Sequence, residues 1–315
     1  MSHENASVKS IVFALLANLG IAITKTIAAI FTGSGAMLAE AIHSFADCGN
    51  QLLLFLGLKK SKTGTDEKHP LGHGKEIYFW SFIVALILFS MGGMFSIYEG
   101  VHKLSHHEGL KSPLIAVVVL AVSIVLEGAS LYGCIAQIKK VKRKDISLWN
   151  WAKNTRNSEL VVVLGEDTAA ILGLVLALIS ILLTWATGNQ IFDAAGSIAI
   201  GVLLVFVSIF LGIKVKGLLI GQSSDYETQN TIISFLESRP EIESILNIKT
   251  LQLGADIMIA VKAKMKNVNS TDELIRNINA CETDLHQLNP ILNGYFLNRM
   301  LRVKSFVSNF PLNFA

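Results

Sequence analysis

Charged residues are scarce in this chain of 315 residues. Lys, Arg, Asp and Glu together make up 16% of it, while 51% is hydrophobic, and an ordinary soluble domain carries about 25% charged residues. Long apolar runs alternate with short charged loops, and only the C-terminal third has the composition of a soluble protein. The composition therefore excludes a wholly soluble protein and indicates several membrane-spanning helices in contact with a lipid bilayer.

Cysteine and net charge are low as well. The three cysteines, Cys48, Cys134 and Cys281, lie far apart and form no CxxC pair, which excludes a disulfide framework and a zinc ribbon. The net charge is only +3 and the positive residues sit in loops, so nucleic acid is not an expected partner. No basic segment precedes the first apolar run, which we therefore interpret as a retained membrane span rather than a signal peptide.

Six apolar stretches reach the length of about 20 residues that a membrane helix needs. Lys and Arg concentrate in the loops after the second and fourth stretches, and the positive-inside rule places those loops and both termini in the cytoplasm. The compact loops and the lack of a targeting segment favour the inner membrane of a bacterium. The six stretches are 8–31, 36–58, 77–101, 113–138, 160–185 and 191–213.

The C-terminal region has the alternating helix and strand signals of a small α+β domain. A turn at Gly254 separates two β-rich segments and predicts a hairpin, and Ser270 or Thr271 is typical of a helix N-cap. A further strand is expected after Pro290. The predicted helices are 228–236 and 271–288, and the strands of the hairpin are 248–253 and 257–263.

Together these patterns predict an α-helical membrane protein with six transmembrane helices, followed by a cytoplasmic α+β domain of the ferredoxin-like kind. The expected boundaries put the membrane domain in 1–213, the α+β domain in 214–305 and a short tail in 306–315.

Glu40, His43 and Asp47 lie inside the second apolar stretch. Spacings of three and four residues place their side chains on one face of a helix. Ionisable groups in hydrocarbon cost several kcal/mol unless they are paired, hydrated or bound to metal, so an imidazole and carboxylates on one face predict half of a metal site. For Glu40, which is nearer the outer end, an entry path for ions and a simple contact with the membrane surface are equal alternatives.

The other half of the predicted metal site lies in the fifth stretch. Glu166 and Asp167 are adjacent there, at a depth that matches Asp47 when the helix boundaries move by a few residues. Two helices that offer acidic or imidazole ligands at one level predict a site with four ligands. The alternative is that Glu166 or Asp167 is an interfacial or capping acid near the membrane surface.

Other polar residues of the chain are interpreted as structural. Lys25 is expected to reach the membrane surface or to pair with Glu127, and Asn18 is expected to hold two helices together by hydrogen bonds. His69 and His73 in HPLGHGK have the spacing of a metal site on a helix, but the intervening proline and glycine favour a turn.

Several of these segments resemble one known family, the cation diffusion facilitators. SGAMLAEAIHSFAD resembles the signature of the family's second helix, and HPLGHGKEIYFW resembles the stretch that leads into its third helix. The layout of six spans with a cytoplasmic α+β tail matches the family over nearly the whole chain. VVVLGEDTAAILG, with the following ATGN and FDAAGS, resembles the branch of the family that includes zinc transporter 9.

The resemblance implies a transporter, not an enzyme. It implies a homodimer, joined through the C-terminal domain and the membrane helices, that exports Zn²⁺ or another divalent metal in exchange for protons. It also implies that His43, Asp47 and Asp167 bind the metal. The histidine that the family has four residues before Asp167 is replaced by Val163. Three alternatives follow: Glu166 replaces the missing ligand, water completes the site, or the metal is a different one. Because His286 is the only histidine of the tail, a full regulatory metal site is not expected.

The expected donors limit the choice of ion. One imidazole with oxygen ligands suits Zn²⁺ and also admits Mn²⁺, Co²⁺ or Fe²⁺, whereas the lack of a thiolate argues against Cu(I). The metal and H⁺ are expected as transported ions, and no permanently bound cofactor is expected. Because Val163 replaces a ligand, the alternative is a non-transporting regulatory or partner-binding membrane subunit on the same scaffold, and a channel is a weaker third possibility.

Overall fold

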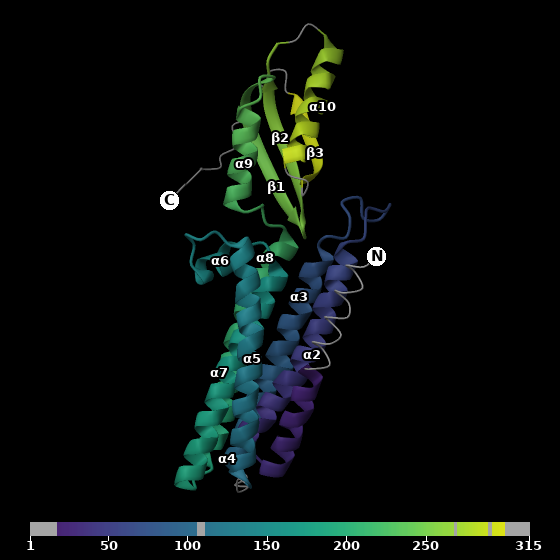
Figure 1. The fold of residues 1–315 in the computed structure, drawn as a ribbon. Helices are drawn as coiled ribbons and strands as arrows, with labels where there is room; N and C mark the ends of the chain where they lie inside the picture. Colours follow the sequence, from purple (N-terminus) through teal and green to yellow (C-terminus); the bar gives the residue numbers. More distant parts are fainter. Residues whose placement is uncertain (1–17, 106–110, 268–269, 289–291, 300–315) are drawn as a thin grey trace, which may run out of the picture. The chain divides into compact units, whose positions relative to one another are not determined.

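The chain divides into two compact units, one extending to Ile220 and the other beginning at Gly221. Figure 1 shows a bundle of helices in the first unit and helices against a sheet in the second. Residues 8–17 of the predicted first span and the predicted tail 306–315 lie outside the described residues. The computed structural model describes residues 18–105, 111–267, 270–288 and 292–299.

The first unit consists of helices at all six predicted apolar stretches, as far as these stretches are described. The helices are Asn18–Thr32, α2 Gly35–Ser61, α3 Glu76–Ile87, η1 Leu88–Met94, α4 Phe95–Ser105, α5 Pro113–Val141, the short α6 Leu148–Asn154, α7 Ser158–Thr187 and α8 Ile191–Ile220. The π-helical η1 joins α3 and α4 into one continuous helix.

Four of the described helices are long and apolar enough to cross a membrane: the continuous helix of α3, η1 and α4, then α5, α7 and α8. The helix Asn18–Thr32 is apolar but shorter. The 27 residues of α2 would suffice in length, but its ionisable residues lower its hydropathy. The first unit is therefore a membrane domain, with at least these four helices as candidates to span the membrane.

The outward-facing side chains of the bundle are large and apolar, as expected for a lipid-facing surface. Val125 on α5 is 70% exposed, and Phe206 and Ile213 on α8 are 69% and 67% exposed. Small residues lie where helices touch. A Cβ on Gly201 of α8 would lie 2.7 Å from the carbonyl oxygen of Gly93 in η1, so these two helices approach backbone to backbone.

The start of α2 is fixed by contacts with α8. Ser34 is the N-cap of α2 and accepts a hydrogen bond from the Met37 amide at 3.1 Å. The carboxylate of Asp193 on α8 accepts hydrogen bonds from Ser34 Oγ at 2.5 Å and from the Gly35 amide at 2.7 Å, and Lys103 of α4 pairs with it at 3.1 Å. These contacts join the start of α2 to α8 and α4.

The second unit follows the order α9, β1, β2, α10, β3, so the predicted hairpin and both predicted helices are present. The sheet order is β1-β2-β3, with β1 antiparallel and β3 parallel to β2. This matches the last five elements of the six-element ferredoxin-like pattern, and no strand precedes α9 among the described residues of this unit. The bounds are α9 Tyr226–Glu237, β1 Ile242–Leu253, β2 Asp256–Met265, α10 Thr271–Leu288 and β3 Leu292–Arg299.

One face of β2 and the two helices form the core of the second unit. Side chains alternate along β2, and the buried set of Ile257, Ile259, Val261, Ala263 and Met265 packs with residues of α9 and α10. Of the two predicted caps of α10, Ser270 is the one whose hydroxyl accepts a hydrogen bond from the Glu273 amide, at 3.1 Å. The alternation of side chains along β2 and the cap of α10, both of which can be recognised in a few neighbouring residues of the sequence, are therefore present in this unit.

Candidate metal centre

One face of α2 carries several polar side chains in the interior of the bundle. Glu40, His43 and Asn50 are fully buried, and the side chain of Asp47 is 16% exposed. The predicted face at Glu40, His43 and Asp47 thus points inward, and Asn50 extends it by one turn. His43 Nε2 lies 3.5 Å from Asp47 Oδ2, as the spacing of four residues on a helix allows.

Polar atoms without partners concentrate on this face. Of the seven buried side-chain atoms that lack a hydrogen-bond partner among the described residues, five belong to α2: Glu40 Oε1, Asp47 Oδ1, Asn50 Oδ1 and both ring nitrogens of His43. Leaving such an atom unsatisfied costs about 1–3 kcal/mol, and a native structure tolerates this mainly where the atoms serve a function. The α2 face therefore has the donor atoms of a binding site.

The structure brings Asp47 of the α2 face together with the predicted acids of α7, whereas His43 lies beside Asp47 and is not among the residues that line their shared cavity. Asp47, Glu166 and Asp167 all line one cavity of about 50 Å³. Asn50 of α2 donates a hydrogen bond from Nδ2 to Glu166 Oε1 at 2.6 Å, which ties the two helices together at this level. Both adjacent acids reach the cavity, so neither is a capping residue at a helix end. Whether these groups bind a metal stays a prediction.

Two residues that were interpreted as structural also line this cavity. Glu127 of α5 and Asn18 of the first helix are among the lining residues, as is Ser130, whose hydroxyl donates to Asp167 Oδ2 at 3.2 Å. Glu127 and Ser130 are three residues apart and share one face of α5. An acid inside an apolar stretch is a signal that α5 takes part in a site, but the sequence does not say which site.

The predicted pairing of Lys25 with Glu127 is wrong. Lys25 is fully buried, and its Nζ donates to Ser44 Oγ at 2.7 Å and to Glu40 Oε2 at 3.3 Å. The short linker between the first helix and α2 makes them antiparallel neighbours, so Lys25 faces α2 rather than α5. Lys25 also does not reach the membrane surface.

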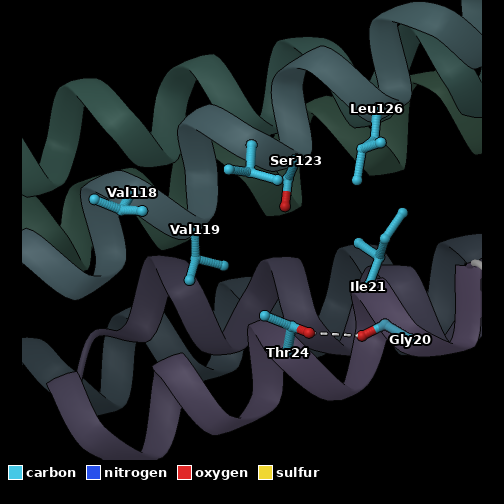
Figure 2. Close-up of a pocket in the computed structure, with 8 residues that line it drawn as sticks. Gly20, Ile21, Thr24, Val118, Val119, Ser123 and Leu126 are labelled. Carbon is cyan, nitrogen blue, oxygen red and sulfur yellow. Dashed lines mark hydrogen bonds between the residues drawn. The ribbon is translucent and has the colours of Figure 1, made fainter.

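Figure 2 shows that the first helix and α5 are separated along part of their length by an apolar pocket. The pocket has a volume of about 340 Å³ and is lined by Ile21 and Thr24 on one side and by Val119 and Leu126 on the other. Neither Lys25 nor Glu127 is among the residues that line this pocket.

Glu40 does not reach the membrane surface as one of its two interpretations required. Its carboxylate is fully buried and paired with Lys25 at 3.3 Å. A Cβ on Gly173 of α7 would lie 2.4 Å from Glu40 Oε1, so the absence of a side chain at Gly173 makes room for Glu40. Glu40 is not among the residues that line the cavity at Asp47.

Val163 also lines the cavity. It lies one turn before Asp167 on α7, at the position where the resemblance led us to expect a histidine. An isopropyl side chain cannot coordinate a metal, so Glu166 and Asp167 are the only possible metal ligands among the α7 residues that line the cavity.

A second cluster of possible ligands lies in the loop between α2 and α3. His69 and His73 lie in a turn, as predicted, but both rings point at Asp66, which had not been considered. His69 Nδ1 and His73 Nε2 each lie 3.0 Å from an Asp66 carboxylate oxygen, and the three ligand atoms lie within 4.8 Å of one another. Two imidazoles and one carboxylate are a donor set that suits Zn²⁺.

The Asp66 carboxylate is held in its charged form. The hydrogen bond to His73, together with one from the His69 amide, lowers the pKa of Asp66 to about 2. Because this folded-state pKa lies below the ordinary value of 3.8, the hydrogen bonds to the carboxylate favour folding above pH 3.8 and are lost as the pH falls toward 2. Asp66 is therefore charged and ready to bind a cation throughout the physiological range.

We expect the variant in which His69 and His73 are both replaced by Ala to bind one Zn²⁺ ion fewer per chain than the unaltered protein, because a lone exposed carboxylate holds Zn²⁺ weakly. Equilibrium dialysis of the purified protein against Zn²⁺ measures this. His286→Ala, in the second unit, is the matched control and should leave the number of bound ions unchanged. An unchanged stoichiometry and affinity in the double variant would exclude this cluster as a metal site.

Comparisons with known proteins agree on one family. The model of the cation efflux transmembrane domain matches residues 11–220. The Xenopus laevis protein named proton-coupled zinc antiporter SLC30A9, mitochondrial, is 39% identical over 231 residues, which are 73% of this chain and 41% of that protein. Metal tolerance protein C4 of Arabidopsis thaliana is 34% identical over 224 residues, 71% of this chain and 49% of that protein.

The alignment with one bacterial relative covers a larger share of that relative's length. Magnetosome protein MamB of Magnetospira sp. (strain QH-2) is 25% identical over 251 residues, which are 79% of this chain and 80% of that protein. The alignments to the two eukaryotic relatives above cover less than half of those proteins.

Proposed function

Because the chain belongs to the cation efflux family, that of the cation diffusion facilitators, we propose that it is a secondary active transporter that exports a divalent metal cation in exchange for protons. This family consists of transporters rather than enzymes. The observation that carries the proposal is the cavity at Asp47, Glu166 and Asp167, which collects carboxylates from separate membrane helices. Beside it, the His43 imidazole lies 3.5 Å from Asp47 and has no hydrogen-bond partner among the described residues.

Zn²⁺ is the ion we propose first. Imidazole and carboxylate ligands suit Zn²⁺, and relatives at 38–39% identity bear the name of proton-coupled zinc antiporters. The same donors admit Mn²⁺, Co²⁺ and Fe²⁺, which a mixed nitrogen and oxygen site separates by geometry more than by ligand type.

The proposed exchange follows from the chemistry of the ligands. His43 binds a metal only as neutral imidazole, and Asp47, Glu166 and Asp167 bind it only as carboxylates, so metal binding releases protons. When the site opens to a more acidic outer side, protons compete the metal off. When it opens to the cytoplasm, the metal displaces the protons. Rocking of helix groups around a site at membrane depth supplies the change of access.

The proposal includes six membrane-spanning helices, with the helix Asn18–Thr32 and α2 added to the four long apolar ones. Their order puts the basic loops after α2 and after α5 on one side, which we take as cytoplasmic together with both termini. We propose the inner membrane of a bacterium as the location, and a homodimer joined through the second unit and the membrane helices. Analytical ultracentrifugation in detergent tests the dimer.

We expect the reconstituted protein to move Zn²⁺ only when a proton gradient is present. Vesicles that contain a zinc-sensitive dye report the flux, because uphill movement of the metal must be coupled to downhill movement of protons. Collapsing the gradient with a protonophore should abolish accumulation, and protein-free vesicles are the control. Flux that is independent of the gradient would indicate a channel instead.

The second candidate is a non-transporting membrane subunit on the same scaffold, and the specific observation in its favour is Val163. If no flux of Zn²⁺, Mn²⁺, Co²⁺ or Fe²⁺ is measured while the purified protein remains folded and dimeric, the transport proposal fails and this candidate replaces it.

A further inference from the structure

The cavity beside Asp47 has a fourth carboxylate, from a third long helix. Glu127 of α5 lines it together with Asp47 of α2 and with Glu166 and Asp167 of α7. The remaining lining residues are Asn18, Ser44, Gln51, Ser130 and Val163, so no Lys or Arg is among them. Four acids therefore face a space of about 50 Å³ without a basic side chain in its wall.

Lys25 is the buried lysine near the cavity among the described residues, but it does not line the cavity itself. Its Nζ donates to Ser44 Oγ, which is part of the wall, and to Glu40 Oε2, which is outside the wall. Carboxylates gathered at membrane depth repel one another and are costly to ionise. A cation in the cavity would offset this repulsion.

A second and independent feature points to a cation as the ligand. The His43 side chain is 1% exposed, neither of its ring nitrogens has a hydrogen-bond partner, and Nε2 is directed at Asp47 Oδ2 from 3.5 Å. Asn50 Oδ1 is equally unpartnered, although its amide nitrogen holds Glu166. A metal ion binds to nitrogen and oxygen lone pairs that accept no hydrogen bond, and carboxylates beside them balance its charge.

The position of α5 at this cavity is fixed by a hydrogen bond. Ser130 Oγ holds Asp167 Oδ2 at 3.2 Å, and Glu127 lies one turn earlier on the same face of α5. α5 packs chiefly against α7, the helix that carries Val163. Glu127 is thus held opposite the helix that lacks its expected imidazole.

We propose that Glu127 is a ligand of the transported cation, supplied by α5 in place of the histidine that Val163 replaces on α7. This inference rests on the proposed function. It gives the site one imidazole and an excess of carboxylate oxygens, a donor set that accepts harder divalent cations such as Mn²⁺ more readily than a site with a second imidazole does.

The test compares variants of Glu127 in the full-length protein, with Zn²⁺ and with Mn²⁺. Glu127→Gln keeps the shape and loses the charge, and we expect the KM for either metal to rise about tenfold or more, as losses of metal-site groups do. Glu99→Gln, which makes the same change on α4 outside the cavity wall, is the matched control. Both variants are first compared with the unaltered protein by size-exclusion chromatography and thermal unfolding.

A rescue experiment separates a ligand from a merely structural residue. Val163 lines the same cavity, so Val163→His in the Glu127→Gln background should restore Zn²⁺ transport while Mn²⁺ transport stays low. Glu127→His alone should show the same shift toward Zn²⁺, and it supplies a second test if Glu127→Gln does not fold.

The outcomes distinguish this inference from the proposed function. If the unaltered protein moves no metal, the transport proposal fails, and Zn²⁺ binding by isothermal titration calorimetry still tests Glu127. If the unaltered protein binds or moves Zn²⁺ and Glu127→Gln does so with the same KM and the same selectivity, Glu127 is not a ligand and the inference is overturned.

Discussion

Asp47→Asn is expected to abolish proton-driven Zn²⁺ transport, with a loss of about 100-fold or more in initial flux, since even groups that only support a metal ligand are worth 10–100-fold. Asp47 lines the cavity and faces His43 Nε2 at 3.5 Å. The amide of asparagine keeps the volume of the side chain, but it removes the negative charge and one oxygen that can bind the metal. The measurement is Zn²⁺ flux into dye-loaded vesicles under a fixed proton gradient.

The same substitution should not destabilise the protein. Asp47 has a buried oxygen without a partner and shares its cavity with Glu127, Glu166 and Asp167. Removing one of four neighbouring negative charges relieves repulsion, so metal-free Asp47→Asn should unfold at the same temperature as the unaltered protein or above it. Stability sacrificed for function is typical of active and binding sites.

Asp145→Asn is the control for this prediction. Asp145 lies in an exposed loop and pairs with Arg143 at 3.0 Å. The substitution therefore makes the same chemical change away from the cavity. Unchanged flux in Asp47→Asn, or an equal loss of flux in both variants, would contradict the assignment of Asp47 as a ligand.

The helices of the first unit were predictable because hydropathy marks the apolar part of each one. The predicted stretch 191–213 corresponds to α8, which continues to Ile220 through Lys214 and Lys216. Hydropathy ends at the first lysine, but Lys is a good helix former, so the helix does not end there. Long apolar runs therefore locate helices and underestimate their length.

Strand β1 illustrates where local patterns fail. The predicted strand begins at residue 248, and β1 begins at Ile242. The pairing of β1 with β2 is irregular between Ile242 and Ser244 and again between Ile245 and Asn247. Such irregularities break the strict alternation of inward and outward side chains, and without that alternation the first half of β1 has no strand signal.

The residues of the candidate site on α2 and α7 were predictable, and the contribution of α5 was not. Glu40, His43 and Asp47 lie on one helix, where spacing alone decides which side chains share a face. The position of Glu127 in the same cavity depends on how α5 is rotated against α7, and no property of α5 by itself specifies that rotation. Interhelical contacts also decided that Lys25 pairs with Glu40, because the antiparallel connection to α2 places the Glu40 carboxylate 3.3 Å from Lys25 Nζ.

Lys25→Met is expected to destabilise the first unit strongly, by about 3–5 kcal/mol, since removing one partner of a buried ion pair leaves the other charge uncompensated. Lys25 and Glu40 are both completely buried, with Nζ 3.3 Å from Oε2. Glu40 Oε1 already lacks a partner, so Glu40 would have no hydrogen-bond donor left. The readout is the midpoint of thermal unfolding in detergent, followed by fluorescence-detected size exclusion.

A second substitution should restore the stability. With Glu40→Met added to Lys25→Met, no buried charge remains, and replacing both members of a buried pair by apolar groups of similar volume is often neutral or stabilising. Lys139→Met, at the exposed end of α5, is the control and should change little. If Lys25→Met unfolds at the same temperature as the unaltered protein, the buried pair is not formed as described.

The double variant also separates two roles of the Lys25–Glu40 pair. Glu40 lies one turn before His43 on α2, so its charge acts on the metal site, whereas its contact with Gly173 only joins α2 to α7. If the pair is purely structural, the double variant should recover Zn²⁺ flux together with stability. A variant that is stable but transports at less than about one tenth of the normal rate, the size of effect that groups beside metal ligands have, would place Lys25 and Glu40 in the transport cycle itself.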